Sequence, residues 1–275
     1  MSSLIRESAQ PENSYDRRLW IVAGFAAIVL AAFLLAPGTV ASKTHVALHG
    51  LCAQRPSHSI QIGGATLPMD ARMTGIYIGA AISVCWLIAA GRMRAMRPPS
   101  LSVIATLAVL VAALAVDGFN ALLVDLAMLH PYEPSNALRL VTGVLAGTAL
   151  GVVLGHLCAV SMWSQGDRRI AVVTTPRELI VPLLISGGVG WLAMTDLPVL
   201  FAPFAVGLLA AAVGVFSLLG MVFVALVSDR GWSSRTIGDL APMACAGFGA
   251  AIVMIGALSG LRFLAEHVFG LPRLT

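Results

Sequence analysis

Residues 101–129 read LSVIATLAVLVAALAVDGFNALLVDLAML, and this stretch decides the class of fold. Its only charged residues are Asp117 and Asp125. A helix needs about 20 predominantly apolar residues to cross a bilayer, so this stretch is long enough to span one. The whole chain of 275 residues follows the same trend, with 58% hydrophobic residues, 11% charged residues and a mean hydropathy of +0.90. Because a soluble domain carries about 25% charged residues, this composition indicates an integral membrane protein.

Further apolar runs flank this stretch on both sides. They predict an all-α, polytopic bundle of about seven transmembrane helices at residues 19–37, 73–91, 101–129, 136–163, 178–194, 199–227 and 240–264. The predicted transmembrane domain covers residues 19–264, with a tail at 1–18, a long loop at 38–72 and a second tail at 265–275. Thr39-Val40-Ala41 resembles a signal-peptide cleavage site, but the preceding apolar run exceeds the usual 7–15 residues, which favours an uncleaved helix.

Basic residues predict the orientation, since cytoplasmic loops carry an excess of Lys and Arg. With the amino terminus in the cytoplasm, the cytoplasmic segments hold eleven of the 17 basic residues: Arg6, Arg17, Arg18, Arg92, Arg94, Arg97, Arg168, Arg169, Arg177, Arg230 and Arg235. The other side holds Lys43, Arg55, Arg72, Arg139, Arg262 and Arg273. We therefore expect the loop 38–72 and the carboxyl terminus outside. No basic patch with interleaved aromatic residues occurs, so the expected partner is the lipid bilayer and not nucleic acid.

The loop 38–72 contains residues that suit a metal. His45, His49 and Cys52 are spaced i, i+4, i+7, which places them on one face if the segment is helical. Imidazole and thiolate bind transition metals, and His58 and Asp70 follow in the same loop. The alternative is an amphipathic helix at the membrane interface. With a single loop cysteine, the sequence predicts no intrachain disulfide.

Carboxylates within a predicted span must be paired or face a cavity, because an ionised group at the bilayer centre costs about 2.5–3.5 kcal/mol on insertion scales. If the spans 101–129 and 136–163 form a symmetric hairpin about residue 132, Asp125 lies level with Arg139 and Asp117 lies level with Gly147. We therefore predict an Asp125–Arg139 ion pair. Asp117 is left as a functional residue or a buried hydrogen-bond anchor.

Small residues and a histidine mark the span 136–163. Gly143, Gly147, Gly151 and Gly155 recur every four residues, a pattern that allows helix backbones to approach closely. Here it predicts packing within the chain. His156 is either a proton relay or, as we expect, a residue held by a backbone carbonyl of a neighbouring helix.

Two stretches resemble a known family. The first runs Leu51-Cys52-Ala53-Gln54-Arg55-Pro56-Ser57-His58-Ser59 and continues at residues 67–79, with Asp70, Arg72 and Tyr77. The second joins Asp117-Gly118 to Ser135-Asn136-Ala137-Leu138-Arg139-Leu140-Val141-Thr142-Gly143. Together, over about residues 45–155, they resemble prokaryotic membrane proteins catalogued as domain of unknown function 2085.

The resemblance implies which positions to examine and brings no established activity. In the family, a Cys-His-Gln element is followed by Cys-x-x-Cys. In this chain Ala53 replaces that histidine, and Asp70 and Met73 stand where the later cysteines would be. The candidate binding residues are His49, Cys52, Gln54, Arg55, His58, Asp70, Arg72, Tyr77, Asp117, Asn136 and Arg139. The candidate metal ligands are His45, His49, Cys52, His58 and Asp70.

Three classes of function remain open from sequence. The first is a protein of the prokaryotic cytoplasmic membrane that binds or transports an ion or small solute at an extracytoplasmic polar site. The second is a metal-dependent membrane enzyme or redox protein, with a transition metal as its cofactor. The third is a structural or assembly subunit of a membrane complex. No HExxH, GxSxG or P-loop pattern occurs, which lowers the expectation of an enzyme.

Overall fold

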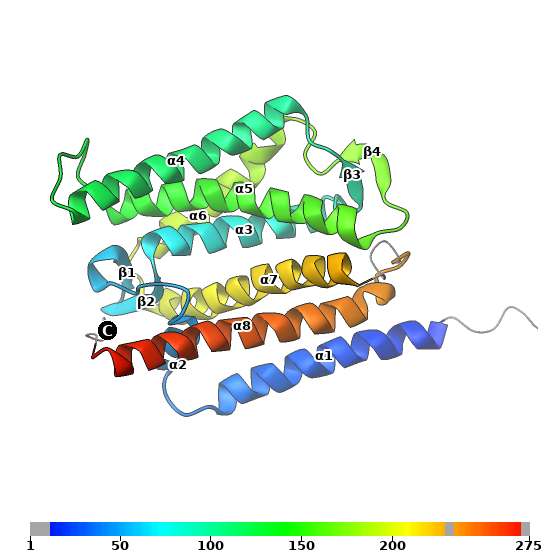
Figure 1. The fold of residues 1–275 in the computed structure, drawn as a ribbon, viewed down its shortest axis with the longest axis horizontal. Helices are drawn as coiled ribbons and strands as arrows, with labels where there is room; N and C mark the ends of the chain where they lie inside the picture. The colour runs from blue at the N-terminus through cyan, green and yellow to red at the C-terminus, as the bar shows by residue number, and fades with distance from the viewer. Residues whose placement is uncertain (1–11, 229–233, 271–275) are drawn as a thin grey trace, which may run out of the picture.

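The computed structural model describes residues 12–228 and 234–270, and the side chains from Trp20 onward within them. Arg6, Arg230 and Arg273 lie outside the described residues. The chain forms an α-helical bundle whose long helices run side by side along one axis (Figure 1). Its helices are α1 (Glu12–Leu35), α2 (Val40–Leu48), α3 (Ala71–Ala89), α4 (Leu101–Asp125), α5 (Asn136–Met162), α6 (Ile180–Ala193), α7 (Phe201–Val227) and α8 (Ala241–Val268).

Short strands close both ends of the bundle (Figure 1). At one end β1 (Ser59–Ile62) and β2 (Ala65–Asp70) form an antiparallel hairpin. Gly63 and Gly64 form its two-residue turn at φ +60° and +77°, the conformation that favours glycine in tight hairpins. At the other end β3 (Ala95–Arg97) and β4 (Asp167–Ala171) pair in parallel.

Most of the long helices coincide with apolar runs that are long enough to cross a membrane. Within the described residues, five helices are long and apolar enough to cross a membrane, or up to six if the bent pair α1–α2 counts as one span. That pair is bent by 120°. The helix α6 has 14 residues, about 21 Å at 1.5 Å per residue, which is shorter than the roughly 30 Å hydrocarbon core. The all-α bundle is confirmed, while the number of seven spans and the orientation stay predictions.

The glycine face of α5 packs on α3. A Cβ at Gly151 would lie 2.6 Å from the Ala80 carbonyl oxygen, and a Cβ at Gly147 would meet the Ile76 carbonyl oxygen. The reverse contact runs from Gly79 to the Val144 carbonyl oxygen, at 2.5 Å. Packing within the chain is therefore confirmed. The symmetric hairpin implied that this face packs on α4, but its partner is α3.

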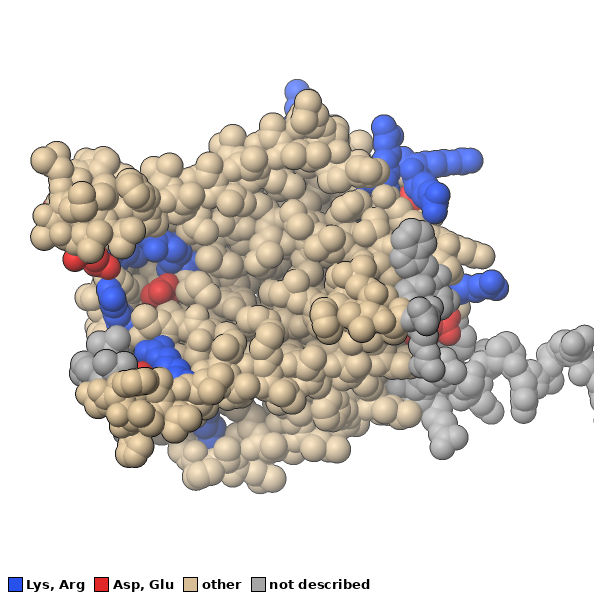
Figure 2. Space-filling view, viewed as in Figure 1, with Lys and Arg blue, Asp and Glu red and all other residues tan. Residues whose placement is uncertain are grey.

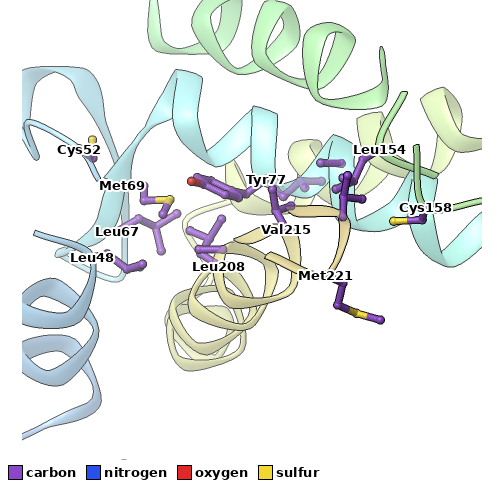
Figure 3. Packing of buried hydrophobic residues seen from close by; sticks show 14 of the residues in the cluster. Leu48, Cys52, Leu67, Met69, Tyr77, Leu154, Cys158, Leu208, Val215 and Met221 are labelled. Atoms are coloured by element: carbon purple, nitrogen blue, oxygen red, sulfur yellow. The ribbon is translucent and has the colours of Figure 1, made fainter. Parts of the chain in front are cut away.

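The core joins the first half of the chain to the second. Leu48, Leu67 and Tyr77, from α2, β2 and α3, belong to one buried cluster with Leu208 and Val215 of α7 (Figure 3). Outside this core the visible side face carries few charges, and most Lys, Arg, Asp and Glu lie toward the two ends (Figure 2). This distribution suits a bilayer around the middle of the bundle.

Candidate functional site

The structure gathers most of the candidate residues at the end of the bundle that carries the β1–β2 hairpin and the α4–α5 connection (Figure 1). Figure 2 shows acidic and basic side chains together at this end, at the left of the view. We call this end the polar end. It contains two separate hydrogen-bonded clusters, one around Asp117 and one around His49.

Asp117 is the centre of the first cluster and is 1% exposed. Arg72 Nη2 donates to its Oδ2 at 2.6 Å, and the Thr142 hydroxyl donates to the same oxygen at 3.3 Å. The Tyr132 hydroxyl donates to Oδ1 at 3.3 Å. Burial and the charge of Asp117 raise the pKa of Tyr132, so that its phenol keeps the proton that it donates. Every contact to the carboxylate thus comes from a donor.

The α4–α5 connection folds back on α4 instead of forming a symmetric hairpin. The Asn120 amide donates to the Tyr132 carbonyl oxygen at 2.8 Å and accepts from the Tyr132 N–H at 3.4 Å. This two-way contact draws residue 132 back beside Asn120, which offsets the two helices. Asp117 therefore lies beside Thr142, and the prediction that it is level with Gly147 is wrong.

The predicted Asp125–Arg139 pair is also wrong. Asp125 ends α4 at the rim of the polar end, where Arg55 Nη1 approaches its Oδ2 at 3.2 Å. Both side chains are 47% exposed, and such pairs contribute about 0–1 kcal/mol. The offset of α4 against α5 leaves Arg139 deeper in the protein than the symmetric hairpin implied.

Arg139 is buried, at 8% exposure, beside the Asp117 cluster. Its Nη1 donates to Asn136 Oδ1 at 3.0 Å, and within the described residues no other acceptor bonds to its guanidinium. Asn136 in turn donates to the carbonyl oxygens of Ser57 and Ser59, which fixes the hairpin connection against α5. Ser135 caps the same helix, its hydroxyl accepting from Leu138 N–H.

His58 lies close to these charges. Burial lowers the pKa of His58, and the nearby positive charges of Arg139 and Arg55 lower it further. The imidazole is therefore neutral at neutral pH. Arg72 Nε is buried without a hydrogen-bond partner in the described part of the chain.

The second cluster surrounds His49, which is buried. Its Nδ1 lies 2.9 Å from Gln54 Oε1, and its Nε2 lies 2.9 and 3.0 Å from the two carboxylate oxygens of Glu266. The Gln54 amide nitrogen donates to two carbonyl oxygens, so Oε1 is the atom that accepts from His49. Both ring nitrogens of His49 therefore lie within hydrogen-bond distance of side-chain oxygen atoms.

Arg262 ties this cluster to α8. Its Nε donates to Glu266 Oε1 at 2.9 Å, an i, i+4 pair along α8. Its Nη1 donates to the carbonyl oxygens of His49 and Cys52. The sequence analysis did not place Arg262 or Glu266 among the candidate site residues. A lone carboxylate near the end of an apolar span was the signal that could have marked Glu266 for a buried partner.

A cavity of about 480 Å³ adjoins His49 and Glu266. His45 and Gln54 also line it, and Phe263 stacks on the His49 ring with centroids 4.1 Å apart. His45 Nε2 lies 2.9 Å from the Thr66 carbonyl oxygen. The polar groups at its wall are thus already engaged with the protein.

The metal site predicted for His45, His49, Cys52, His58 and Asp70 does not form. Within residues 12–228 and 234–270, no three His, Cys, Asp or Glu side chains are grouped as metal ligands would be. The helix α2 ends at Leu48, so the i, i+4, i+7 face is interrupted before Cys52. Each of His45, His49 and Cys52 takes its own protein partner instead.

Cys52 is held as a thiol. Its Sγ donates to Asp70 Oδ2 at 3.2 Å and accepts from the N–H groups of Gln54 and Asp70. Burial and the charge of Asp70 raise the pKa of Cys52 from 9.0 to about 11. Asp70 also caps α3 by accepting from Met73 N–H at 2.8 Å, which keeps the carboxylate beside the thiol. All four cysteines are free in the structure.

We predict that Cys52 reacts slowly with thiol reagents even where they reach it. The thiolate is the nucleophile, and a pKa of about 11 instead of 9.0 leaves roughly 100-fold less thiolate at pH 8. Alkylation of a variant that retains Cys52 alone should keep accelerating from pH 8 to 10. The same chain unfolded in denaturant provides the control. A rate that levels off near pH 9 in the folded protein would contradict the burial of this thiol.

Two candidates lie away from both clusters. Tyr77 belongs to the apolar core and has no hydrogen bond within the described residues (Figure 3). His156 Nδ1 is buried without a partner in the same part of the chain, so the predicted carbonyl contact at this nitrogen is wrong.

The comparisons with known proteins agree with the sequence reading. Residues 52–153 match the family model described as "Predicted membrane protein (DUF2085)". No curated protein and no solved structure matches the chain. The matched segment contains the Asp117 cluster and most of the polar end, although Glu266 and Arg262 lie beyond it. The chain is a multi-pass membrane protein whose residues 52–153 match the model of that family.

Proposed function

We propose that the polar end binds a small solute through an anionic group, between the guanidinium groups of Arg72 and Arg139. The observation that carries this proposal is an excess of buried positive charge and of buried donors. Arg139 is buried and Arg72 is 25% exposed, and within the described residues Asp117 is the only acidic side chain that pairs with either guanidinium group. Arg72 Nε is buried with no acceptor among the described residues. Buried donors without partners are costly, and an anion would supply the acceptors.

The same geometry disfavours a cation at this place. The Asp117 carboxylate already accepts from Arg72, Tyr132 and Thr142. A metal or ammonium ion would have to displace Arg72, leaving a buried guanidinium uncompensated. Of the ions and solutes considered from sequence, an anion therefore has the better support.

Binding at one end is better supported than a pore between α3 and α5. Immediately beyond Thr142, these two helices pack backbone to backbone at Gly143, Gly147 and Gly151. Such contacts leave no room for a solute between them. In the orientation predicted from basic residues, the polar end lies outside the cytoplasmic membrane of a prokaryote, where it would meet solutes from the surroundings.

The alternatives have less support. A metal-dependent or redox enzyme lacks a set of ligands among the described residues, and Cys52 is held as a thiol. A structural or assembly subunit would explain the hydrogen-bonded clusters, but not the buried Arg72 Nε.

Thermal melts of the detergent-solubilised chain with a panel of sodium salts test the proposal. Phosphate, sulfate and small carboxylates are compared with chloride at equal ionic strength, and potassium salts control for the cation. One class of anion should raise the Tm of the parent chain, because a ligand that binds the folded state stabilises it. Arg139→Gln should weaken that binding about tenfold or more, since it removes a charged donor.

Arg55→Gln is the matched control, because Arg55 is exposed and paired with Asp125 at the rim of the same end. It should leave the anion response unchanged. If the response follows the cation, or if Arg55→Gln removes as much of it as Arg139→Gln does, the proposed site is wrong.

A further inference from the structure

The opposite end of the bundle holds a cavity of about 770 Å³ that is lined by arginine side chains. It lies between the α3–α4 connection and the α5–α6 connection. Arg92, Arg94, Arg97 and Arg169 contribute to its wall, and Asp167 is the one acidic residue among the described residues that line it. Figure 2 shows basic side chains extending from this end, at the right of the view.

The parallel pairing of β3 with β4 brings together two of the segments that line the cavity. Ala95 is in register with Asp167 and Arg97 with Ala171, so two connections far apart in sequence bring their arginines together. Arg92 fixes the assembly by donating to the Ala171 carbonyl oxygen at 2.9 Å and the Thr174 hydroxyl at 3.2 Å. Arg94 is held over the Trp163 ring, 4.1 Å from its centroid.

The remaining two arginines have their donors available. Arg97 and Arg169 are exposed, and no acceptor bonds to either side chain within the described residues. Asp167 makes no hydrogen bond to either guanidinium group in the described structure. Its Oδ1 accepts from the backbone N–H of Arg169 at 2.7 Å. Ser100, which precedes α4 and also lines the cavity, makes no capping bond to a backbone N–H of the helix, and its hydroxyl lies 3.0 Å from the Ser102 hydroxyl. The cavity thus combines two free guanidinium groups with the start of a helix, where backbone donors favour anions.

The surface next to the cavity is apolar. Leu101, at the start of α4, is 81% exposed, and Ile104 one turn further along is also exposed. Ile170 of β4 is exposed at the cavity wall itself. A ligand that fits this place has a phosphate group that binds the arginines and an apolar chain that packs on the exposed side of α4. A soluble phosphate would use only the first of these two features.

We propose that this cavity binds the phosphate headgroup of an anionic phospholipid, whose acyl chains lie along the exposed side of α4. Basic pockets between transmembrane helices at the cytoplasmic side are a recurrent form of lipid recognition. This end is the one predicted to face the cytoplasm. The proposal is independent of the anion site at the polar end, which lies at the other end of the helices.

Lipid titrations of the full chain in neutral detergent test the proposal. Phosphatidylglycerol, phosphatidylcholine and inorganic phosphate are added separately, and the Tm and the number of retained lipids by native mass spectrometry are measured. Phosphatidylglycerol should raise the Tm and remain bound. The double variant Arg97→Gln, Arg169→Gln should bind it roughly 30-fold more weakly, since each basic residue near an anionic lipid surface contributes a factor of about five.

The control is the double variant Arg168→Gln, Arg177→Gln. It removes the same charge from exposed positions of β4 and of the turn before α6 that do not line the cavity. It should bind phosphatidylglycerol like the parent chain, and both double variants should melt like the parent without lipid. The single variants Arg97→Gln and Arg169→Gln give the same comparison if the first double variant folds poorly.

Three results would overturn the proposal. Equal losses in the two double variants would show attraction to general surface charge. Equal stabilisation by phosphatidylcholine would show a detergent-like effect without headgroup recognition. A response to inorganic phosphate as strong as that to phosphatidylglycerol, lost in the same variant, would assign the cavity to a soluble phosphate compound.

Discussion

Gly147→Leu should prevent α3 and α5 from packing and lower the stability of the detergent-solubilised protein by about 3 kcal/mol or more. Overpacking a well-filled contact costs about 1–3 kcal/mol and occasionally more. Here the added atoms meet the carbonyl group and Cα of Ile76, which are backbone atoms that cannot rotate away. The measurement is a thermal or denaturant melt followed by the loss of helical circular dichroism.

Gly118→Leu is the matched control for this prediction. Gly118 also lies within a long apolar helix, α4, but a Cβ there meets nothing within 4 Å. The same side chain should therefore change the melt little at residue 118. Equal effects at residues 147 and 118 would mean that α5 does not pack on α3 through its glycine face.

Asp117→Asn should also destabilise the protein strongly, because it leaves Arg72 without its counter-charge. Removing one partner of a buried ion pair costs about 3–5 kcal/mol, and less here because Arg72 is partly exposed, at 25%. Arg72→Gln alone should cost a similar amount. The double variant Asp117→Asn, Arg72→Gln should be milder than the sum of the two, and thermal melts of the four chains give the coupling energy.

The exposed pair Arg55–Asp125 provides the comparison for this cycle. Both of its side chains are half exposed, so Asp125→Asn should cost less than about 1 kcal/mol. Additive effects of Asp117→Asn and Arg72→Gln would show that the short contact between them is energetically unimportant. A loss of stability from Asp125→Asn as large as that from Asp117→Asn would contradict the exposure of the Arg55–Asp125 pair.

The positions of the helices could be predicted from sequence because they depend on the length and apolarity of local runs. The run 136–163 became α5 at Asn136–Met162, and the run 101–129 became α4 at Leu101–Asp125. Ser135 signalled the start of α5 through its capping hydroxyl. The sequence Thr195-Asp196-Leu197-Pro198 between two apolar runs predicts a tight turn, and Asp196 adopts a positive φ of 54° there.

The partners of the buried charges could not be predicted, because they depend on offsets between helices. A shift of about five residues in the α4–α5 hairpin separates the predicted level partner of Asp117, Gly147, from its actual neighbour Thr142. That shift arises from Asn120, whose amide draws the connection inward. Arg72, which pairs with Asp117, lies on a third helix that hairpin reasoning did not consider.

The metal prediction failed for a related reason. Spacing places His45, His49 and Cys52 on one face only while the helix continues, and α2 ends at Leu48. The residues then turn toward different partners, of which Glu266 is 217 positions from His49 along the chain. Residue types identified a polar end correctly, whereas local spacing could not determine which residues meet there.

The contacts of Arg262 and Ser259 have a consequence for which parts of this chain can fold independently. Both side chains lie on α8, and they bond to backbone groups of residues 47–53, just before and at the start of the segment that matches the family model. The segment 52–153 also shares its apolar core with α7. A fragment limited to the matched residues would lose these backbone partners and expose that core. In this chain we therefore expect the matched segment to need α7 and α8 in order to fold.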